Sequence, residues 1–434
     1  MVFRMGILNN FLGILDLPKQ TQKLIRKYFL LYFIFSFIAL LGQSYILLNY
    51  IEYWGYYYAG ILSAVTLLVQ LLTDYPTGSL SDYIGQRNII ALACIFMGFS
   101  YFIISQYNSL QIYFLASISF GLGVGQISGA FESYLDNNYK KTVAQVDSDR
   151  KIYGFVYQRM MTLSNMVNSI SIIGGGFLSV LLSRNILFLM VSLLFLLYIP
   201  IVISFLKDYK AVDDILEDKK KSILFYFKGG IKFFISSKES FLLIMARVSI
   251  FVIEGLWVEL MLIPFYFAYT GSDLGVGFFR GILLLATFFI RLYSTKYTKK
   301  IGDQHVGLLN LLYYIVFFPS LIVLFVFIPI HNSFNLLGGI IGILILLMSI
   351  GVISLIVKTS FQRILLKEIP SDIRNSVYSL MPSIANIIEI LLLPLFGFII
   401  EGGGLLAGAE FLFCLSLLSL VFIFFYHKVV QITS

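Results

Sequence analysis

The sequence is dominated by long apolar segments separated by short polar breaks. A helix that crosses the hydrocarbon core of a bilayer needs about 20 mostly apolar residues. Continuous apolar runs of this length do not fit the alternating pattern of a membrane barrel. We therefore expect an all-α membrane protein. Its twelve predicted transmembrane helices are 27–50, 56–81, 88–106, 109–138, 151–182, 185–206, 240–268, 273–296, 304–330, 335–364, 373–400 and 404–427.

The composition excludes a soluble globular protein. Hydrophobic residues make up 59% of the chain and charged residues 12%, whereas a soluble domain has roughly 45–50% and about 25%. The net charge is +8, but Lys and Arg gather in every second loop, with Arg184 as the one clear exception. This distribution places both termini in the cytoplasm. We expect a multi-pass protein of the cell membrane that contacts lipid and binds no nucleic acid.

Residues that carry common site chemistry are sparse. Cys94 and Cys414 lie inside predicted spans far apart in the chain and define no disulfide framework. The three histidines lie in loops or near the C-terminus. The chain has no GxxxxGK[ST] loop to cradle a phosphate. We therefore expect no enzyme activity, no metal, no cofactor and no ATP-driven pumping.

The longest polar interval falls near the midpoint of the chain and separates six predicted spans from six. This division predicts two pseudo-symmetric six-helix bundles. The predicted segments are a cytoplasmic or interfacial N-terminus at 1–26, a first bundle at 27–206, a cytoplasmic linker at 207–239, a second bundle at 240–428 and a tail at 429–434.

Internal repetition supports this division. The loop after the second span and the loop after the eighth align when Gly85 is set against Gly302, an offset of 217 residues. At that offset Asp74 corresponds to Arg291. The two halves thus share the position of this segment but carry opposite charges in it.

The segment GSLSDYIGQR at 78–87 lies between the second and third predicted spans. It resembles the motif G-x-L-[AS]-D-[RK]-x-G-[RK]-[RK] of the major facilitator superfamily, from which Tyr83 and Gln86 depart. Segments DYPTG at 74–78 and SGAFESYLD at 128–136 resemble E-x-P-T-G and S-G-A-x-E-A-x-x-x-D in a prokaryotic efflux-type branch. Segment 369–397 resembles the same branch at its entry into span eleven.

The resemblance implies a secondary carrier whose two halves rock about a midplane site. It also implies a cytoplasmic gate formed by Gly78, Asp82, Gly85 and Arg87. Asp82 would act as a latch on the positive N-terminal end of span eleven. Gly85 also suits a left-handed helix cap. The alternative for Asp82 is a plain helix end in water.

Charged residues inside the predicted spans are candidates for coupling, because a charge at the bilayer centre costs about 2.5–3.5 kcal/mol. Glu254 and Glu389 are the leading candidates to carry a proton, since burial disfavours an ionised carboxylate. Arg247 lies seven residues before Glu254. A static ion pair between these two residues is the open alternative.

Two further sets are candidates. Asp74, Glu132, Asp136 and Arg159 form either a coupling network or ordinary structural ion pairs. Gln158, Thr162, Asn165 and Ser169 share one face of span five, either to line a cavity or to hydrogen-bond a neighbouring helix. The remaining cavity-lining candidates are Glu259, Arg280 and Lys358.

We expect a monomer that transports a small molecule by alternating access, coupled to protons. The predicted substrate is a lipophilic or amphiphilic compound, moved by efflux. This rests on the efflux-like segments and an aromatic content of 17%. The alternatives are proton-coupled uptake of a small polar or anionic solute, and a membrane sensor or partner subunit that does not transport.

Overall fold

The computed structural model describes residues 9–106, 108–143, 147, 150–206, 232, 234–298, 306–327, 340 and 374–433. Every regular element in these ranges is a helix. Seven helices within them are long and apolar enough to cross a membrane. The predicted all-α membrane fold is confirmed. The span predicted at 335–364 lies outside the described residues, apart from residue 340.

The helices follow the predicted spans closely, and two of them hold two spans each. Their bounds are α2 (Lys19–Ile84), α3 (Gln86–Gln106), α4 (Leu110–Ile127), α5 (Ala130–Val143), α6 (Lys151–Leu182), α7 (Arg184–Phe205), α9 (Lys238–Leu256), η2 (Trp257–Met261), α10 (Leu262–Thr270), α11 (Asp273–Thr298), α12 (Val306–Phe327) and α14 (Arg374–Thr433).

Single residues join several consecutive helical arms. The helix α2 breaks at Gly55, with φ 75° and ψ 176°, and α14 breaks at Gly404, with φ 71° and ψ −173°. Glycine adopts these positive φ values without a steric penalty. Ser183 alone separates α6 from α7. Gly55 and Ser183 fall in gaps between the predicted spans, and Gly404 is the first residue of the predicted span 404–427.

Two predicted spans are interrupted where the sequence analysis expected continuous helices. The span at 109–138 breaks into α4 and α5 at Ser128 and Gly129, because Gly129 has φ 72°. The span at 240–268 contains the π-helix η2 between α9 and α10. Apolar length alone predicts a span but not the path of the backbone inside it.

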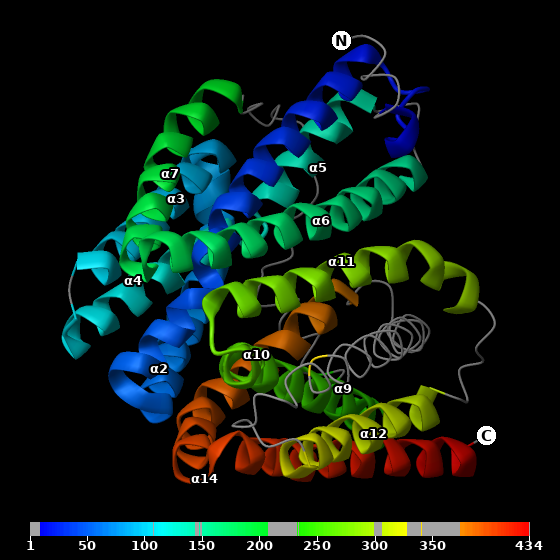
Figure 1. The fold of residues 1–434 in the computed structure, drawn as a ribbon. Coiled ribbons are helices and arrows are strands. Elements are labelled where there is room, and N and C mark those ends of the chain that lie inside the picture. The colour runs from blue at the N-terminus through cyan, green and yellow to red at the C-terminus, as the bar shows by residue number, and fades with distance from the viewer. Residues whose placement is uncertain are drawn as a thin grey trace. The chain divides into compact units, whose positions relative to one another are not determined.

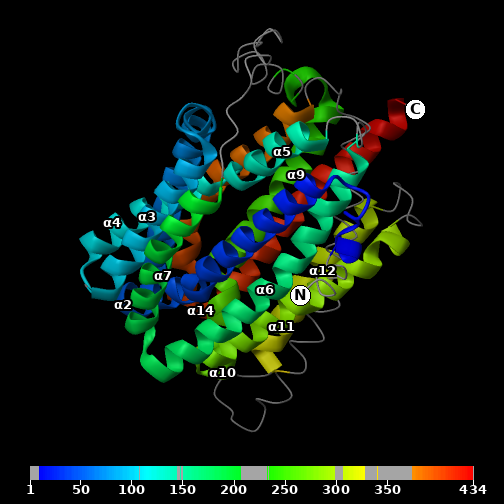
Figure 2. The same cartoon turned by 90° about the horizontal axis from the view of Figure 1, so that it is seen from above.

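The chain divides into two compact units, of which the first comprises Met1–Ile46, Val65–Asp213 and Arg280–Phe288. Within it α3 packs against α4 and α7, and the three helices lie side by side in both views (Figure 1, Figure 2). Hydroxyl groups tie these helices together, as where Ser100 Oγ donates to the carbonyl of Ala116 at 2.9 Å. Such bonds satisfy polar groups between apolar helices.

The second unit comprises Leu47–Ala64, Asp214–Phe279 and Phe289–Ser434. Here α14 packs along α9 and also contacts α12 (Figure 1). The ring of Trp257 in η2 meets Phe317 of α12 edge-on, with centroids 5.2 Å apart. The units differ from the predicted bundles at residues 47–64 and 280–288. The bundle boundaries stay a prediction.

A glycine sets the close approach of α6 to α2. A Cβ at Gly175 would overlap the carbonyl oxygen of Leu41, whereas Gly154 in the same helix has no atom within 4 Å of its Cβ position. Alanine normally stabilises a helix over glycine by about 0.5–1 kcal/mol, but overpacking costs about 1–3 kcal/mol. We expect Gly175→Ala to lower the melting temperature in detergent and Gly154→Ala to leave it unchanged or raise it. Equal melting temperatures for the two variants would contradict this packing.

Candidate functional site

The carboxyl group of Glu389 is buried against the backbone of a neighbouring helix. Glu389 lies in α14 and is 6% exposed. A Cβ at Gly255 in α9 would overlap its carboxyl carbon and both oxygens. The space that holds this carboxyl group therefore exists because residue 255 has no side chain.

A break in helical geometry adjoins this contact. Glu254 precedes Gly255 in α9, and the π-helix η2 starts two residues after Gly255, at Trp257. Glu259 lies in η2, is exposed, and interacts electrostatically with Glu389. Short π-helical turns occur frequently at functional sites. The structure thus gathers Glu254, Glu259 and Glu389, which the sequence analysis treated in two separate sets, around one break.

Two predicted arginines stack on aromatic rings. Within the second unit, the guanidinium of Arg247 lies 4.0 Å from the ring centroid of Phe251, one turn further along α9. Within the first unit, Arg159 lies 4.7 Å from the centroid of Phe11 and 4.8 Å from that of Phe155. Such cation–π contacts stabilise a charge in apolar surroundings. Pairing of Arg247 with Glu254 stays a prediction.

Polar groups of α2, α6 and α11 meet in the first unit. Arg280 Nη1 donates to Ser44 Oγ at 2.7 Å, and Ser44 is 1% exposed. Next to it, Ser169 Oγ donates to the carbonyl of Gly281 at 2.7 Å. Ser169 therefore makes a helix-to-helix hydrogen bond, and Arg280 is held at a buried hydroxyl.

The rest of the predicted polar face of α6 has other contacts. Thr162 Oγ1 donates to the carbonyl of Gln158 in its own helix at 2.8 Å. Gln158 is exposed, and Asn165 is partly exposed. A role for these three residues in lining a cavity stays a prediction.

Two of the predicted inner carboxylates have hydroxyl partners. Ser128, at the break between α4 and α5, donates a hydrogen bond to Asp74. Glu132 Oε1 accepts a hydrogen bond from Tyr157 at 3.4 Å. The break at Ser128, which the sequence analysis did not anticipate, thus supplies the partner of Asp74.

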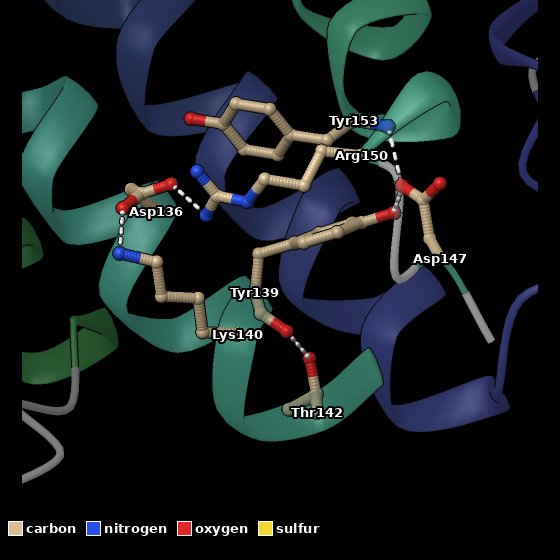
Figure 3. A network of polar contacts seen from close by, with 7 residues as sticks. All are labelled: Asp136, Tyr139, Lys140, Thr142, Asp147, Arg150 and Tyr153. Carbon is tan, nitrogen blue, oxygen red and sulfur yellow. Dashed lines mark hydrogen bonds and ion pairs between the residues drawn. The ribbon is translucent and has the colours of Figure 1, made fainter. Parts of the chain in front are cut away.

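Asp136 forms ion pairs in the same unit. Its carboxylate lies 2.8 Å from Lys140 Nζ and also pairs with Arg150 (Figure 3). Both basic groups are well exposed, and pairs of this kind contribute little to stability. Among the four residues predicted to form a network, Asp136 fits the structural interpretation best.

Asp147 is a polar residue of this region that was not predicted from the sequence. Its carboxylate accepts hydrogen bonds from the Tyr139 hydroxyl at 2.9 Å and from the Tyr153 backbone N–H at 2.9 Å (Figure 3). It also accepts one from the Ile152 backbone N–H at 3.1 Å. It therefore satisfies two of the unpaired N–H groups at the start of α6. Asp147 stands four residues before the first residue of α6, whose N-cap position is Arg150, so the usual signal of a capping residue immediately before a helix does not identify it.

The predicted gate motif is described only in part. Gly85 has φ 90° and separates α2 from α3, as expected for a left-handed cap. Arg87 is partly exposed. The side chain of Asp82 and the surroundings of Gly78 lie outside the described residues, as does all of Lys358. The latch stays a prediction.

Comparison with known proteins places this fold. Residues 28–392 match the Major Facilitator Superfamily. The crystal structure of the nucleoside transporter NupG is similar with a TM-score of 0.70 and 11% identity, covering 95% of this chain and 100% of that one. A bacterial homolog of the human lysosomal transporter Spinster is similar with a TM-score of 0.63 and 14% identity, covering 94% and 96%. No curated protein matches the chain by sequence.

The peptide transporter POT in complex with alafosfalin is also similar, with a TM-score of 0.60 and 14% identity, covering 92% of this chain and 94% of that one. Identities this low establish the fold alone. Together with the family match, they define a multi-pass membrane transporter rather than an enzyme. The chain belongs to the major facilitator superfamily.

Proposed function

We propose that the protein is a proton-coupled carrier that exports a lipophilic or amphiphilic compound by alternating access, with Glu389 as its proton-binding group. The observation that carries the proposal is the carboxyl group of Glu389, 6% exposed and seated on Gly255 beside a π-helix. We place both termini in the cytoplasm on the Lys and Arg distribution. We expect a monomer surrounded by lipid.

Burial of this carboxyl group favours its protonated form. An ionised carboxylate in apolar surroundings is costly, and the group can relieve that cost by neutralising. Opening the site to water on one side removes the cost and favours release of the proton. A carboxyl group whose exposure changes between two states thus links proton movement to the conformational cycle.

The backbone around Glu389 can support such a change. The π-helical turn interrupts the regular α-helical hydrogen bonding, and it begins two residues after Gly255, which accommodates the carboxyl group. A small adjustment of η2 would alter both the space at Gly255 and the distance to Glu259. We infer that this segment moves during transport.

Efflux is the direction favoured by the segments at 74–78 and 128–136, and an aromatic content of 17% suits an apolar substrate. One contact favours a second candidate, uptake of a small polar or anionic solute. Arg280 is held by the buried hydroxyl of Ser44, and a guanidinium in that position can bind an anion. Carriers with similar folds include nucleoside and peptide transporters.

The test is transport by the purified protein in liposomes with an imposed pH gradient. Movement of a lipophilic cation, abolished by a protonophore, supports the proposed function. Movement of nucleosides, dipeptides or small organic anions instead supports the second candidate. Flux that ignores the pH gradient rules out proton coupling. Ligand-induced thermal stabilisation without any flux would indicate a sensor.

A further inference from the structure

The second arm of α2 is capped by a side chain from a distant part of the chain. After the break at Gly55 the helix restarts, and the backbone N–H of Tyr57 donates to Glu401 Oε2 at 2.7 Å. The first N–H groups of a helix have no partner within it, and their positive end attracts a carboxylate. Glu401 in α14 supplies that partner.

The part of α2 after Gly55 and the part of α14 before Glu401 are in backbone contact. A Cβ at Gly60 would overlap the carbonyl oxygen of Leu393, and a Cβ at Gly397 would overlap that of Tyr56. Each helix thus contributes one glycine to the crossing. Close approach of this kind strengthens packing between helices in a membrane. Glu401 lies one turn beyond Gly397, at the end of the crossing.

The cap also depends on Gly55 itself. Its Cβ position lies 2.9 Å from Glu401 Oε2, and its φ of 75° is the joint from which the second arm starts. A side chain at residue 55 would strain the backbone and push the carboxylate away. The local geometry therefore brings one exposed carboxylate to the end of one helix.

The capped arm and α14 come from opposite halves of the sequence. Residues 56–64 belong to the predicted first bundle and Glu401 to the predicted second bundle, whereas the second compact unit of the structure contains both. Alternating access moves the halves against each other, so a contact that joins them at one end must break when that end opens. This step rests on the proposed function.

We propose that Glu401 is a gating residue: its bond to the Tyr57 N–H holds this end of the carrier closed, and loss of the bond favours the state open on that side. This end lies away from the loop that carries Asp82, on the side predicted to be external. Glu401 acts through the position of the helix and does not contact substrate.

The experiment measures access to the arm directly. In the full-length protein with Cys94→Ala and Cys414→Ser, a single cysteine is introduced at Ser63, which lies in the same arm and is 9% exposed. A membrane-impermeant maleimide is added to intact cells, and the labelling rate is measured. We expect Glu401→Ala to raise the labelling rate about fivefold, because an increase of that size corresponds to the loss of one exposed charged contact.

Glu401→Gln keeps the size of the side chain and an acceptor oxygen but removes the charge, so we expect a smaller rise of about twofold. Glu410→Gln, an exposed glutamate in the same helix, is the matched control and should label like the parent. Labelling of both Glu401 variants at the rate of this control overturns the proposal. If Glu401→Ala fails to fold, the comparison of the two glutamine variants decides.

The labelling measurement tests the gating role of Glu401 independently of the proposed proton-coupled transport. Labelling needs neither substrate nor a proton gradient. A raised labelling rate in a protein that shows no proton-driven flux leaves the gate intact and rejects proton coupling. Unchanged labelling in a protein that transports normally rejects the gate alone.

Discussion

Replacing Glu389 by glutamine is expected to abolish proton-driven transport while leaving the protein folded. Glutamine has nearly the same shape as glutamate, so it fits the space over Gly255, but it cannot take up or release a proton. In liposomes, substrate flux driven by a pH gradient should fall to the level of empty vesicles. Exchange of substrate across the membrane at equal pH should continue, because exchange needs no net proton movement.

Glu254→Gln is the matched comparison, since both glutamates are leading candidates and Glu254 directly precedes Gly255. We expect Glu254→Gln to retain gradient-driven flux. The reverse result, with flux lost in Glu254→Gln and kept in Glu389→Gln, would move the proton-binding role to Glu254. Wild-type flux in both variants would remove this region from the coupling mechanism.

Enlarging Gly255 is expected to have the second largest effect. A Cβ at this residue would overlap the carboxyl atoms of Glu389, so Gly255→Ala must displace the carboxyl group or separate α9 from α14. Overpacking of this kind costs about 1–3 kcal/mol. We expect strongly reduced gradient-driven flux and a lower melting temperature, and complete loss of flux in Gly255→Val.

Gly154→Ala is the control for this substitution, because nothing lies within 4 Å of its Cβ position. It should transport like the parent protein. Normal flux in Gly255→Ala would show that transport does not require the contact between the Glu389 carboxyl group and residue 255 of α9. In that case the buried position of Glu389 would be a matter of packing and not of coupling.

The spans could be predicted from the sequence because apolar length is a local property of the chain. The gap between 50 and 56 contains Gly55, and the gap between 400 and 404 ends at Gly404, where the structure has its breaks. The π-helix at Trp257–Met261 could not be predicted, because a mostly apolar run does not distinguish a π-helical turn from the α-helix on either side of it.

The candidate residues could be predicted as individuals but not as partners. Glu389 could be predicted because it is a charged residue inside an apolar run. Its contact with Gly255 could not, because the two residues lie 134 positions apart in the sequence. Glu401 was missed because it lies at the end of a span, where a charge is unremarkable. Its importance depends on Tyr57, 344 residues away.

The single-residue joints have a mechanical consequence. Gly55, Ser183 and Gly404 each connect two long helical arms, and one residue reaches at most about 3.6 Å. The ends of the two helical arms at each joint therefore cannot separate by more than the length of that one residue. If the part of α2 after Gly55 moves away from Glu401, the end of the preceding part must move with it. That preceding part carries Ser44, which is hydrogen-bonded to Arg280. A pull at the membrane surface would thus reach the buried hydroxyl of Ser44 along the backbone, and Arg280 through its hydrogen bond to that hydroxyl.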